Sequence, residues 1–155
     1  MKGNDQIFAL LNSRLAEELT AINQYIVHSE MCANWGYDKL HDAVEKRAIT
    51  EMKHAEKIIS RLLFLEGVPI VSVLNPIHIG DNVEKQLHND LIAEHDAVKV
   101  YADSIKQSAE IGDYGTHELF KSILVDEEDH VDWIEEQLDQ IKQMGIQVYL
   151  SDQVN

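Results

Sequence analysis

Apolar residues recur every three to four positions along four long segments of the chain, which is the period of an amphipathic α-helix. Helix breakers are scarce, because the 155 residues include only seven glycines and two prolines. The four apolar stripes are Ile7, Leu11, Leu15, Ile22 and Tyr25; Leu40, Val44, Ala48, Ile58, Leu62 and Leu65; Leu87, Leu91, Val98, Tyr101 and Ile105; and Phe120, Ile123, Leu124, Ile134, Leu138 and Ile141. The pattern predicts four long helices around a common core.

Residues typical of helix ends bound the first two segments. The first begins near Asn4, a good N-cap, and ends near Gly36. The second starts after Asp38 and is expected to stop at Gly67 and Pro69. Glycine would end it through its permissive φ, and proline through its missing N–H.

The third and fourth segments carry similar signals. The third is predicted to start at Asp81, with Glu84 three residues later as the partner of a capping box, and to end at Gly112. The fourth starts near Thr116 and ends at Gly145. Residues 146–155 then predict a short C-terminal fifth helix.

The lengths of the connections predict the topology. Short links join the first helix to the second and the third to the fourth, so each pair should be antiparallel neighbours. Residues 67–80, between the pairs, are long and apolar enough to cross the full length of a bundle. The fold class is therefore all-α. We expect a single domain over residues 1–155, an antiparallel four-helix bundle with one long crossover, which is the ferritin-like arrangement.

The composition of the chain excludes some classes of function and favours others. A formal charge of −15 argues against nucleic-acid binding, which needs a basic patch, and favours the attraction of cations. No apolar run approaches the length of a membrane span, and the N-terminus lacks the apolar region of a signal peptide. We therefore expect a cytoplasmic chain with no membrane partner. Cys32, the one cysteine, is expected to be a small buried residue.

The two halves of the chain resemble each other when shifted by 76 positions. Apolar stripes alone could match by chance, but the polar residues match as well. Among apolar residues Leu11 falls on Leu87, Leu15 on Leu91, Tyr25 on Tyr101, Ile58 on Ile134 and Leu62 on Leu138; among polar residues Glu18 falls on Glu94, Glu51 on Glu127 and His54 on His130. The fold is thus expected to contain two related helix pairs that contribute the same polar set.

These six polar residues lie on the apolar stripes, so all six should point into the core. Buried carboxylates are costly unless they take up a proton or bind a cation. Four of them converging call for about four positive charges, which two divalent metal ions would supply. A buried ion network without metal is the alternative reading.

The spacing of the six residues supports a metal site. Glutamate and histidine at i and i+3 lie side by side on a helix face. Two Glu-x-x-His motifs, with one further glutamate from each of the other two helices, form the di-iron carboxylate pattern. We expect Glu18 and His54 to bind one metal and Glu94 and His130 the other, with Glu51 and Glu127 as bridges. Iron or manganese suits these ligands, and zinc would also bind.

At these residues the chain resembles bacterioferritin, essentially from end to end. The resemblance implies a ferroxidase that oxidises Fe(II) at a dinuclear iron centre with O₂ or H₂O₂. It implies a hollow shell of 24 subunits, built from two-fold dimers, that stores the ferric mineral. A sister subunit in the shell and a ferredoxin that assists iron release are further candidate partners.

The resemblance also implies haem b at the dimer interface, with Met52 as its axial ligand. Met52 lies about 100° round the helix from Glu51, so it should face away from the metal site; a plain interface methionine is the alternative. Leu19, Ile22, Asn23, Ile26 and Ile49 could line such a haem pocket. Some family members carry histidine and aspartate at the positions of Lys46 and Thr50 as an inner-surface iron site. This chain departs from that pattern, which puts that iron route in doubt.

Other readings stay open. A non-storage di-iron or di-manganese oxidase or peroxidase would use the same ligands, but one cysteine cannot form the Cys-x-x-Cys pairs of rubrerythrins. A DNA-protecting miniferritin would place its site between subunits. Tyr25 and Tyr101 are expected to hydrogen-bond the metal ligands, to serve as core aromatics or, for Tyr25, to donate an electron. The remaining histidines show no partner pattern, and most are expected at the surface or at interfaces; they are His28, His41, His78, His88, His95 and His117.

Overall fold

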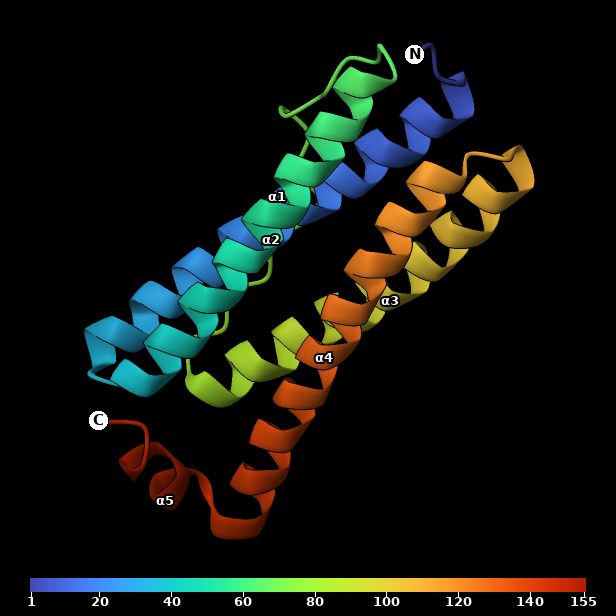
Figure 1. Ribbon diagram of the computed structural model, residues 1–155. Coiled ribbons are helices and arrows are strands. Elements are labelled where there is room, and N and C mark those ends of the chain that lie inside the picture. Colours follow the sequence, from blue (N-terminus) through green and yellow to red (C-terminus); the bar gives the residue numbers. More distant parts are fainter.

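The structure, a computed structural model, describes residues 1–155 and contains five helices and no strand. Four are long and one is short (Figure 1). They are α1 (Asp5–Trp35), α2 (Asp38–Phe64), α3 (Val83–Ile111), α4 (Tyr114–Met144) and α5 (Ile146–Ser151). The prediction of an all-α chain with four long helices and a short C-terminal fifth is confirmed.

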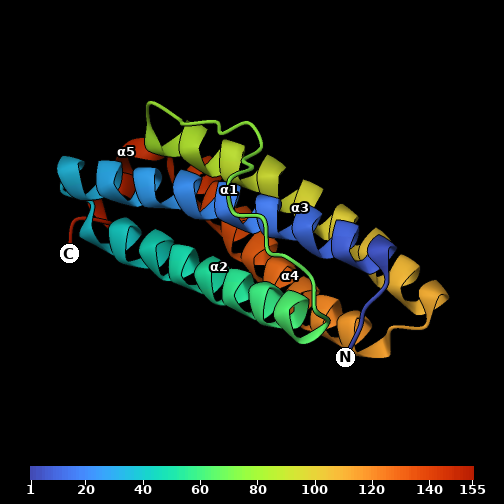
Figure 2. The same ribbon diagram turned by 90° about the horizontal axis from the view of Figure 1, so that it is seen from above.

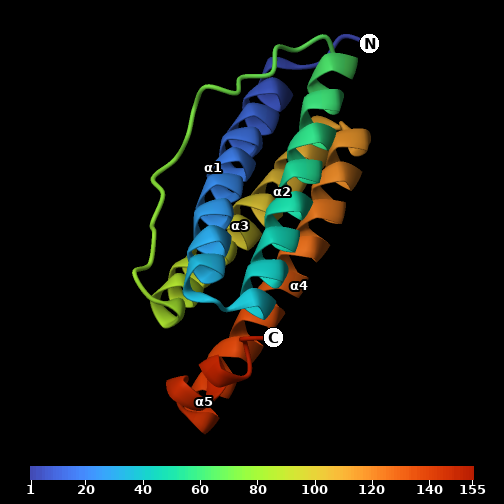
Figure 3. The ribbon, with the colours of Figure 1, turned by 90° about the vertical axis from the view of Figure 1, so that its left-hand side faces the viewer.

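The long helices pack as two antiparallel pairs. α1 lies along α2 and α3 along α4, and the pairs meet through contacts of α1 with α3 and of α2 with α4. The connection between α2 and α3 runs along the length of the bundle beside α1 (Figures 2 and 3), as the one long crossover was predicted to do. None of the helices combines the length and the apolar character that a membrane span needs.

Side-chain caps explain where three helices begin, and two of these starts differ from the sequence prediction. Asn4 caps α1 as expected. α3 starts later than predicted, because the side chain of Asn82 rather than Asp81 accepts a hydrogen bond from the N–H of Lys85 at 2.9 Å. The capping box with Glu84 does not form. α4 starts two residues before Thr116, because Asp113 caps it.

The end of α2 also differs from the prediction. Glu66, not Gly67, adopts the left-handed conformation, with φ of 63°. The N–H of Gly67 then donates to Leu62 O at 2.8 Å and that of Glu66 to Leu63 O at 3.1 Å, which closes a Schellman motif. Gly67 is needed for space, because a Cβ there would lie 2.7 Å from the ring of Phe8.

Three clusters of apolar side chains form the core. One occupies the end of the bundle that holds the start of α1 and the end of α2, and it includes Ile7, Leu11, Leu15, Ile58, Leu62, Tyr101, Phe120 and Ile123. The other two lie further along, around Leu40, Leu87, Ile134 and Tyr149 and around Tyr25, Val44 and Ala48. On every long helix the predicted polar residues fall between these clusters. Cys32 is buried, as predicted.

A buried polar network fastens the crossover to the bundle. His28 is fully buried, with Nδ1 2.9 Å from Asp90 Oδ1 and with Nε2 accepting from the N–H of Gly80 at 3.0 Å. Gln24 donates to the same Asp90 oxygen at 2.8 Å and accepts from the N–H of His78 at 3.1 Å. His28 is therefore an exception to the expectation that most of the remaining histidines lie at the surface or at interfaces. The network links α1, α3 and the crossover, which borders the candidate site described below.

Removing the shared acceptor should release the crossover. We expect Asp90→Ala to destabilise the chain by about 1–3 kcal/mol, because His28 and Gln24 would be left buried without their common partner. The amide hydrogens of residues 77–82 should exchange faster, as measured by hydrogen–deuterium exchange mass spectrometry. His88→Ala, at an exposed position of the same helix, is the matched control. Equal exchange in the two variants would contradict this role for Asp90.

Candidate metal centre

The structure brings all six predicted polar residues together in the middle of the bundle. They come from all four long helices: Glu18 from α1, Glu51 and His54 from α2, Glu94 from α3, and Glu127 and His130 from α4. Each is at most 4% exposed. The apolar clusters at either end fix the register of the helices, so the six side chains are held at one level.

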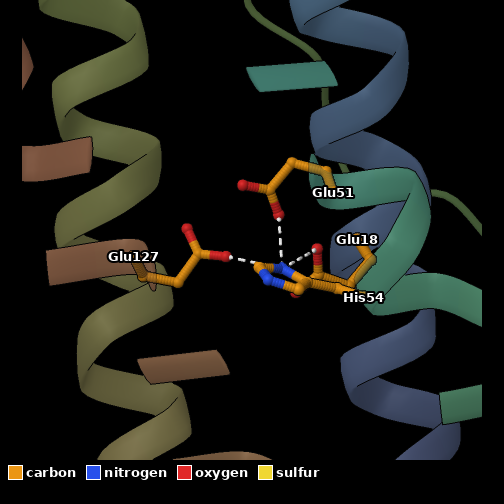
Figure 4. Close-up of side chains that lie close together, drawn as sticks. All are labelled: Glu18, Glu51, His54 and Glu127. Carbon is orange, nitrogen blue, oxygen red and sulfur yellow. Dashed lines mark hydrogen bonds and ion pairs between the residues drawn. The ribbon is translucent and has the colours of Figure 1, made fainter. Parts of the chain in front are cut away.

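Three of these residues, all glutamates, surround the Nδ1 atom of His54 (Figure 4). Nδ1 lies 3.3 Å from Glu51 Oε2, 3.5 Å from Glu18 Oε2 and 3.3 Å from Glu127 Oε1. Their potential ligand atoms all lie within 4.8 Å of one another. A single ion between them could therefore contact three carboxylates and one imidazole.

A second group overlaps the first. Glu51, Glu94 and His130 also place ligand atoms within 4.8 Å of one another, and His130 Nδ1 is 2.9 Å from Glu94 Oε1. Glu51 belongs to both groups, which fits its expected role as a bridge. Glu127 joins only the first group. Two adjacent positions that share a carboxylate are the geometry of a dinuclear centre.

Each glutamate of the cluster has one oxygen without a hydrogen-bond partner. These buried oxygens are Glu18 Oε2, Glu51 Oε1, Glu94 Oε2 and Glu127 Oε1. Three of them have only longer ion-pair contacts, with His54 Nδ1 or Arg47. Leaving a buried carboxylate oxygen without a hydrogen bond is costly, and native cores seldom do so without a ligand. Oxygen and imidazole donors in this number suit divalent iron or manganese. The donor set therefore fits two metal ions.

The acids of the cluster share protons in the metal-free chain. Burial raises the pKa of Glu18, and it raises those of Glu51 and Glu127 well above the usual carboxyl range. Burial also opposes ionisation of Glu94, but contacts with Glu127 and His130 outweigh it and lower that pKa to about 2. The cluster thus retains some negative charge and stores protons that a metal would displace.

His54 supplies a positive charge to the cluster when no metal is bound. Burial disfavours the protonated ring, but the carboxylates of Glu127, Glu18 and Glu51 outweigh burial and raise the pKa of His54. The imidazolium then takes the place of a cation among these acids. A metal would replace the proton on Nδ1.

Two tyrosines support the glutamates from opposite sides. Tyr101 donates its hydroxyl proton to Glu18 Oε1 at 2.5 Å, and Tyr25 donates to Glu94 Oε1. Burial raises the pKa of both phenols well above the ordinary value, so both remain donors. The expectation that these tyrosines hydrogen-bond the ligands is confirmed. Electron donation by Tyr25 stays a prediction.

The structure adds three neighbours that the sequence reasoning missed. Asp126 Oδ2 lies 2.7 Å from His54 Nε2, on the side of the ring away from the cluster. Arg47 comes within 3.9 Å of Glu51 Oε1, and Trp133 stacks on His130 with ring centroids 6.0 Å apart. The signal for Asp126 was available, because the chain repeat pairs it with Thr50, at a position already singled out.

A cavity of about 550 Å³ gives access to the cluster between α1, α3 and the crossover. All four glutamates of the centre line it. Its other polar lining includes Glu17, Thr20, Gln24, Asn75, His78, Asn89, Asp96 and Lys99. The centre is thus buried between the apolar clusters but can be reached from one side of the bundle.

Met52 lies outside the centre. Its side chain is 45% exposed, on the outer face of α2, as its angular offset from Glu51 predicted. It borders a shallow apolar depression whose other lining residues are Ile22, Ile26, Ser29, Glu30, Glu45, Ala48 and Ile49. Of the residues expected to line a haem pocket, Ile22, Ile26 and Ile49 lie there, whereas Leu19 and Asn23 do not.

The bundle topology and the ligand pattern together define a class of protein. Four helices joined by one long crossover, with two Glu-x-x-His motifs and two further glutamates projecting inward, are characteristic of the ferritin-like di-metal carboxylate proteins. The comparison with known families agrees, because residues 8–144 match the ferritin-like domain of the ferritin family.

Comparison with individual relatives identifies the family within this class. The chain is 42% identical over 147 residues to the bacterioferritin of Rhodobacter capsulatus, covering 95% of this chain and 91% of the relative. It is 40% identical to the bacterioferritin of Brucella melitensis biotype 1, and the match covers 96% of this chain and 92% of the relative. It is 36% identical to bacterioferritin BfrA of Mycobacterium tuberculosis, and that match covers 96% of this chain and 94% of the relative. The chain belongs to the bacterioferritin family.

The shared protons predict how the metal-free protein responds to pH. Glu51 and Glu127 have folded pKa values well above their unfolded values, so the folded chain holds protons that the unfolded chain releases. The raised pKa of His54 acts in the same direction, since its stabilisation is complete below the unfolded value and is lost as the pH rises. The thermal midpoint should therefore increase as the pH falls from about 8 to about 6. The lowered pKa of Glu94 acts only at lower pH.

Surface repulsion in a chain of charge −15 would also weaken on acidification, so a control variant is needed. The double variant Glu51→Gln/Glu127→Gln removes two of the titrating groups and keeps the surface charge. Its thermal midpoint should depend less on pH over the same interval. Equal slopes in the two proteins would show that the cluster does not hold these protons.

Proposed function

We propose that this chain is a ferroxidase and iron-storage subunit that oxidises Fe(II) to Fe(III) at the buried centre and stores the product in a shell of 24 subunits. The observation that carries the proposal is the set of four buried carboxylate oxygens without a hydrogen-bond partner, one per glutamate, beside two buried histidines. Membership of the bacterioferritin family supports the assignment of iron as the metal.

Fe(II) is the substrate of this reaction, and in this proposal each of two ions has its own glutamate and histidine. Glu18 and His54 hold one ion and Glu94 and His130 hold the other, with Glu51 and Glu127 between them. Two Fe(II) ions give up two electrons, which reduce O₂ to H₂O₂ with two protons, or H₂O₂ to two waters with two protons. Holding both ions side by side removes the need for separate encounters with the oxidant.

The protein residues contribute charge balance and position. The four glutamates offset the charge of two Fe(II) ions, and each Fe(II) displaces protons that the empty cluster holds. The hydroxyls of Tyr25 and Tyr101 fix one oxygen of Glu94 and one of Glu18, leaving the other oxygen of each free for metal. The acid-lined cavity between α1 and α3 attracts cations toward this set.

Exposed apolar side chains support assembly into a shell. The crossover exposes Val68, Ile70, Val71, Val73, Leu74, Ile77 and Ile79, and the outer faces of α1 and α2 expose Ile26, Val27, Ile49 and Met52. Apolar surface of this extent on one chain is typical of subunit interfaces. Further copies of the chain would cover it, in two-fold dimers that build the shell. A sister subunit in that shell and a ferredoxin as partner in iron release are proposed from the family alone.

The ferroxidase proposal is tested by removing one ligand. We expect Glu94→Ala to abolish fast aerobic oxidation of Fe(II), followed by absorbance of the ferric product, while the particle size stays unchanged. Glu110→Ala, an exposed acid on the same helix, is the matched control and should oxidise Fe(II) normally. Oxidation at the original rate in Glu94→Ala would remove the centre as the reaction site.

The amount of iron that the unmodified protein retains distinguishes iron storage from another di-metal reaction. After aerobic loading and desalting, the unmodified protein should retain tens of irons per chain on a large particle. Retention of about two irons per chain, the content of the dinuclear centre alone, would favour a non-storage di-iron or di-manganese oxidase or peroxidase.

Haem b is the second ligand that we propose, held by Met52. A thioether is a known axial ligand of haem iron, and apolar isoleucines flank the Met52 side chain. The depression measures about 250 Å³, below the roughly 300 Å³ of ordinary ligand pockets, so a second copy would have to complete it across a two-fold axis. A bound haem would supply a one-electron carrier.

Replacing the thioether should abolish haem binding. We expect Met52→Leu to take up no haem during reconstitution, as judged by the Soret absorbance, while still oxidising Fe(II). Met144→Leu, at a methionine of similar exposure near the end of α4, should bind haem like the unmodified protein. Equal Soret bands in both variants would exclude Met52 as the ligand.

A further inference from the structure

The chain repeat gives the two metal positions matching ligands but different surroundings. The shift that places Glu18 on Glu94 and His54 on His130 also places Tyr25 on Tyr101. Three neighbours break the match. Asp126 corresponds to Thr50, Arg47 to Ile123, and Trp133 to Lys57. The two halves of the centre therefore have the same candidate metal ligands, but the residues that contact their histidines differ.

His54 is fixed by a charged partner. Its Nε2 lies 2.7 Å from Asp126 Oδ2, while Nδ1 faces the glutamates of the centre. A proton on Nε2 donated to this carboxylate leaves Nδ1 as the nitrogen that is free to bind a metal. The guanidinium of Arg47 donates to the main-chain oxygen of Asp126 at 3.2 Å and so holds this part of α4 against α2.

His130 has a different partner. The one carboxylate in ion-pair contact with its ring is Glu94, which meets Nδ1 on the side of the centre. Thr50, which corresponds to Asp126, donates its hydroxyl to the main-chain oxygen of Lys46 at 3.2 Å, within its own helix. Trp133 stacks on the ring with an interplanar angle of 21°. Stacking fixes the plane of the ring, but an indole has no acceptor for an imidazole N–H.

We propose that Asp126 is a positioning residue that makes the Glu18–His54 position the tighter of the two metal positions, so that this position fills first. The inference rests on the di-metal function proposed above. A carboxylate behind a metal-bound histidine orients the ring and raises its basicity, and loss of such a partner typically weakens metal binding by about 10–100-fold. The Glu94–His130 position lacks this support and exchanges its ion more readily.

Anaerobic titration of the metal-free protein with Co(II), followed by visible absorption, measures the two positions without turnover. The unmodified protein should bind two cobalt ions per chain in two separate steps. Asp126→Ala should weaken the first step by about 10–100-fold and leave the second where it was. Asp126→Asn should fall between, because its amide oxygen still accepts from Nε2 without the charge. Asp129→Ala, an exposed acid on the same helix, controls for lost charge and should titrate like the unmodified protein.

Two further measurements identify the positions. In crystals that hold one cobalt per chain, anomalous scattering should place the ion between Glu18 and His54. Thr50→Asp, which supplies the missing carboxylate on the other side, should tighten the second step and bring the two steps together. An unchanged second step in Thr50→Asp would overturn the explanation of the weaker position.

The outcomes separate this inference from the proposed function. Failure of the unmodified protein to bind Co(II) at the centre would remove the di-metal function itself. Two cobalt ions bound in a single step, or a first step that Asp126→Ala leaves unchanged, would overturn only the role of Asp126. An equal loss of both steps with a lower thermal midpoint of the metal-free variant would show that Asp126 acts on the fold and would likewise overturn the proposal.

Discussion

The burial of four carboxylates at one level of the bundle is the constraint on which the rest of the structure depends. Each would cost several kcal/mol if it remained ionised and unpaired in an apolar core. In the metal-free chain the cost is reduced locally: Glu51 and Glu127 hold protons, and the imidazolium of His54 lies among the acids. A pair of divalent cations would neutralise the same set more completely. The surrounding fold therefore has to hold the four carboxylates together even when no metal is bound.

That requirement explains the length of the helices and the division of the core. A polar layer contributes no hydrophobic stabilisation, so apolar clusters on both sides have to fix the four helices against each other. Each long helix consequently carries apolar contacts before and after its polar residues. The crossover adds a further restraint, because His28, Gln24 and Asp90 fasten it across α1 and α3. The cavity beside the centre then keeps a defined wall.

Periodicity and the chain repeat were enough to predict the helices, the topology and the convergence of the six polar residues. These features follow from patterns that repeat many times along the chain. The contacts that the sequence did not predict each depend on one residue or one local contact rather than on a repeated pattern. Asp81 and Asn82 are both competent caps, and the structure uses Asn82. The contact of His54 with Asp126 joins residues 72 positions apart, so it depends on the register between α2 and α4. His28 is buried because a loop folds over it, which no helical pattern encodes.

The chain repeat bears on how the centre would perform the proposed ferroxidase reaction. Reduction of one oxidant molecule by two electrons needs both positions filled at the same moment, whereas storage needs the product to leave. Two positions of unequal affinity would fill in a fixed order, the tighter one first. Both ions would be oxidised in the same step, so both would have to leave before the next turnover, and the cavity beside the centre offers the path. The chain keeps the ligands of its two halves matched and differs behind the histidines, at Asp126 and Thr50. Altering the support of a ligand changes affinity without changing the geometry that the electron transfer needs.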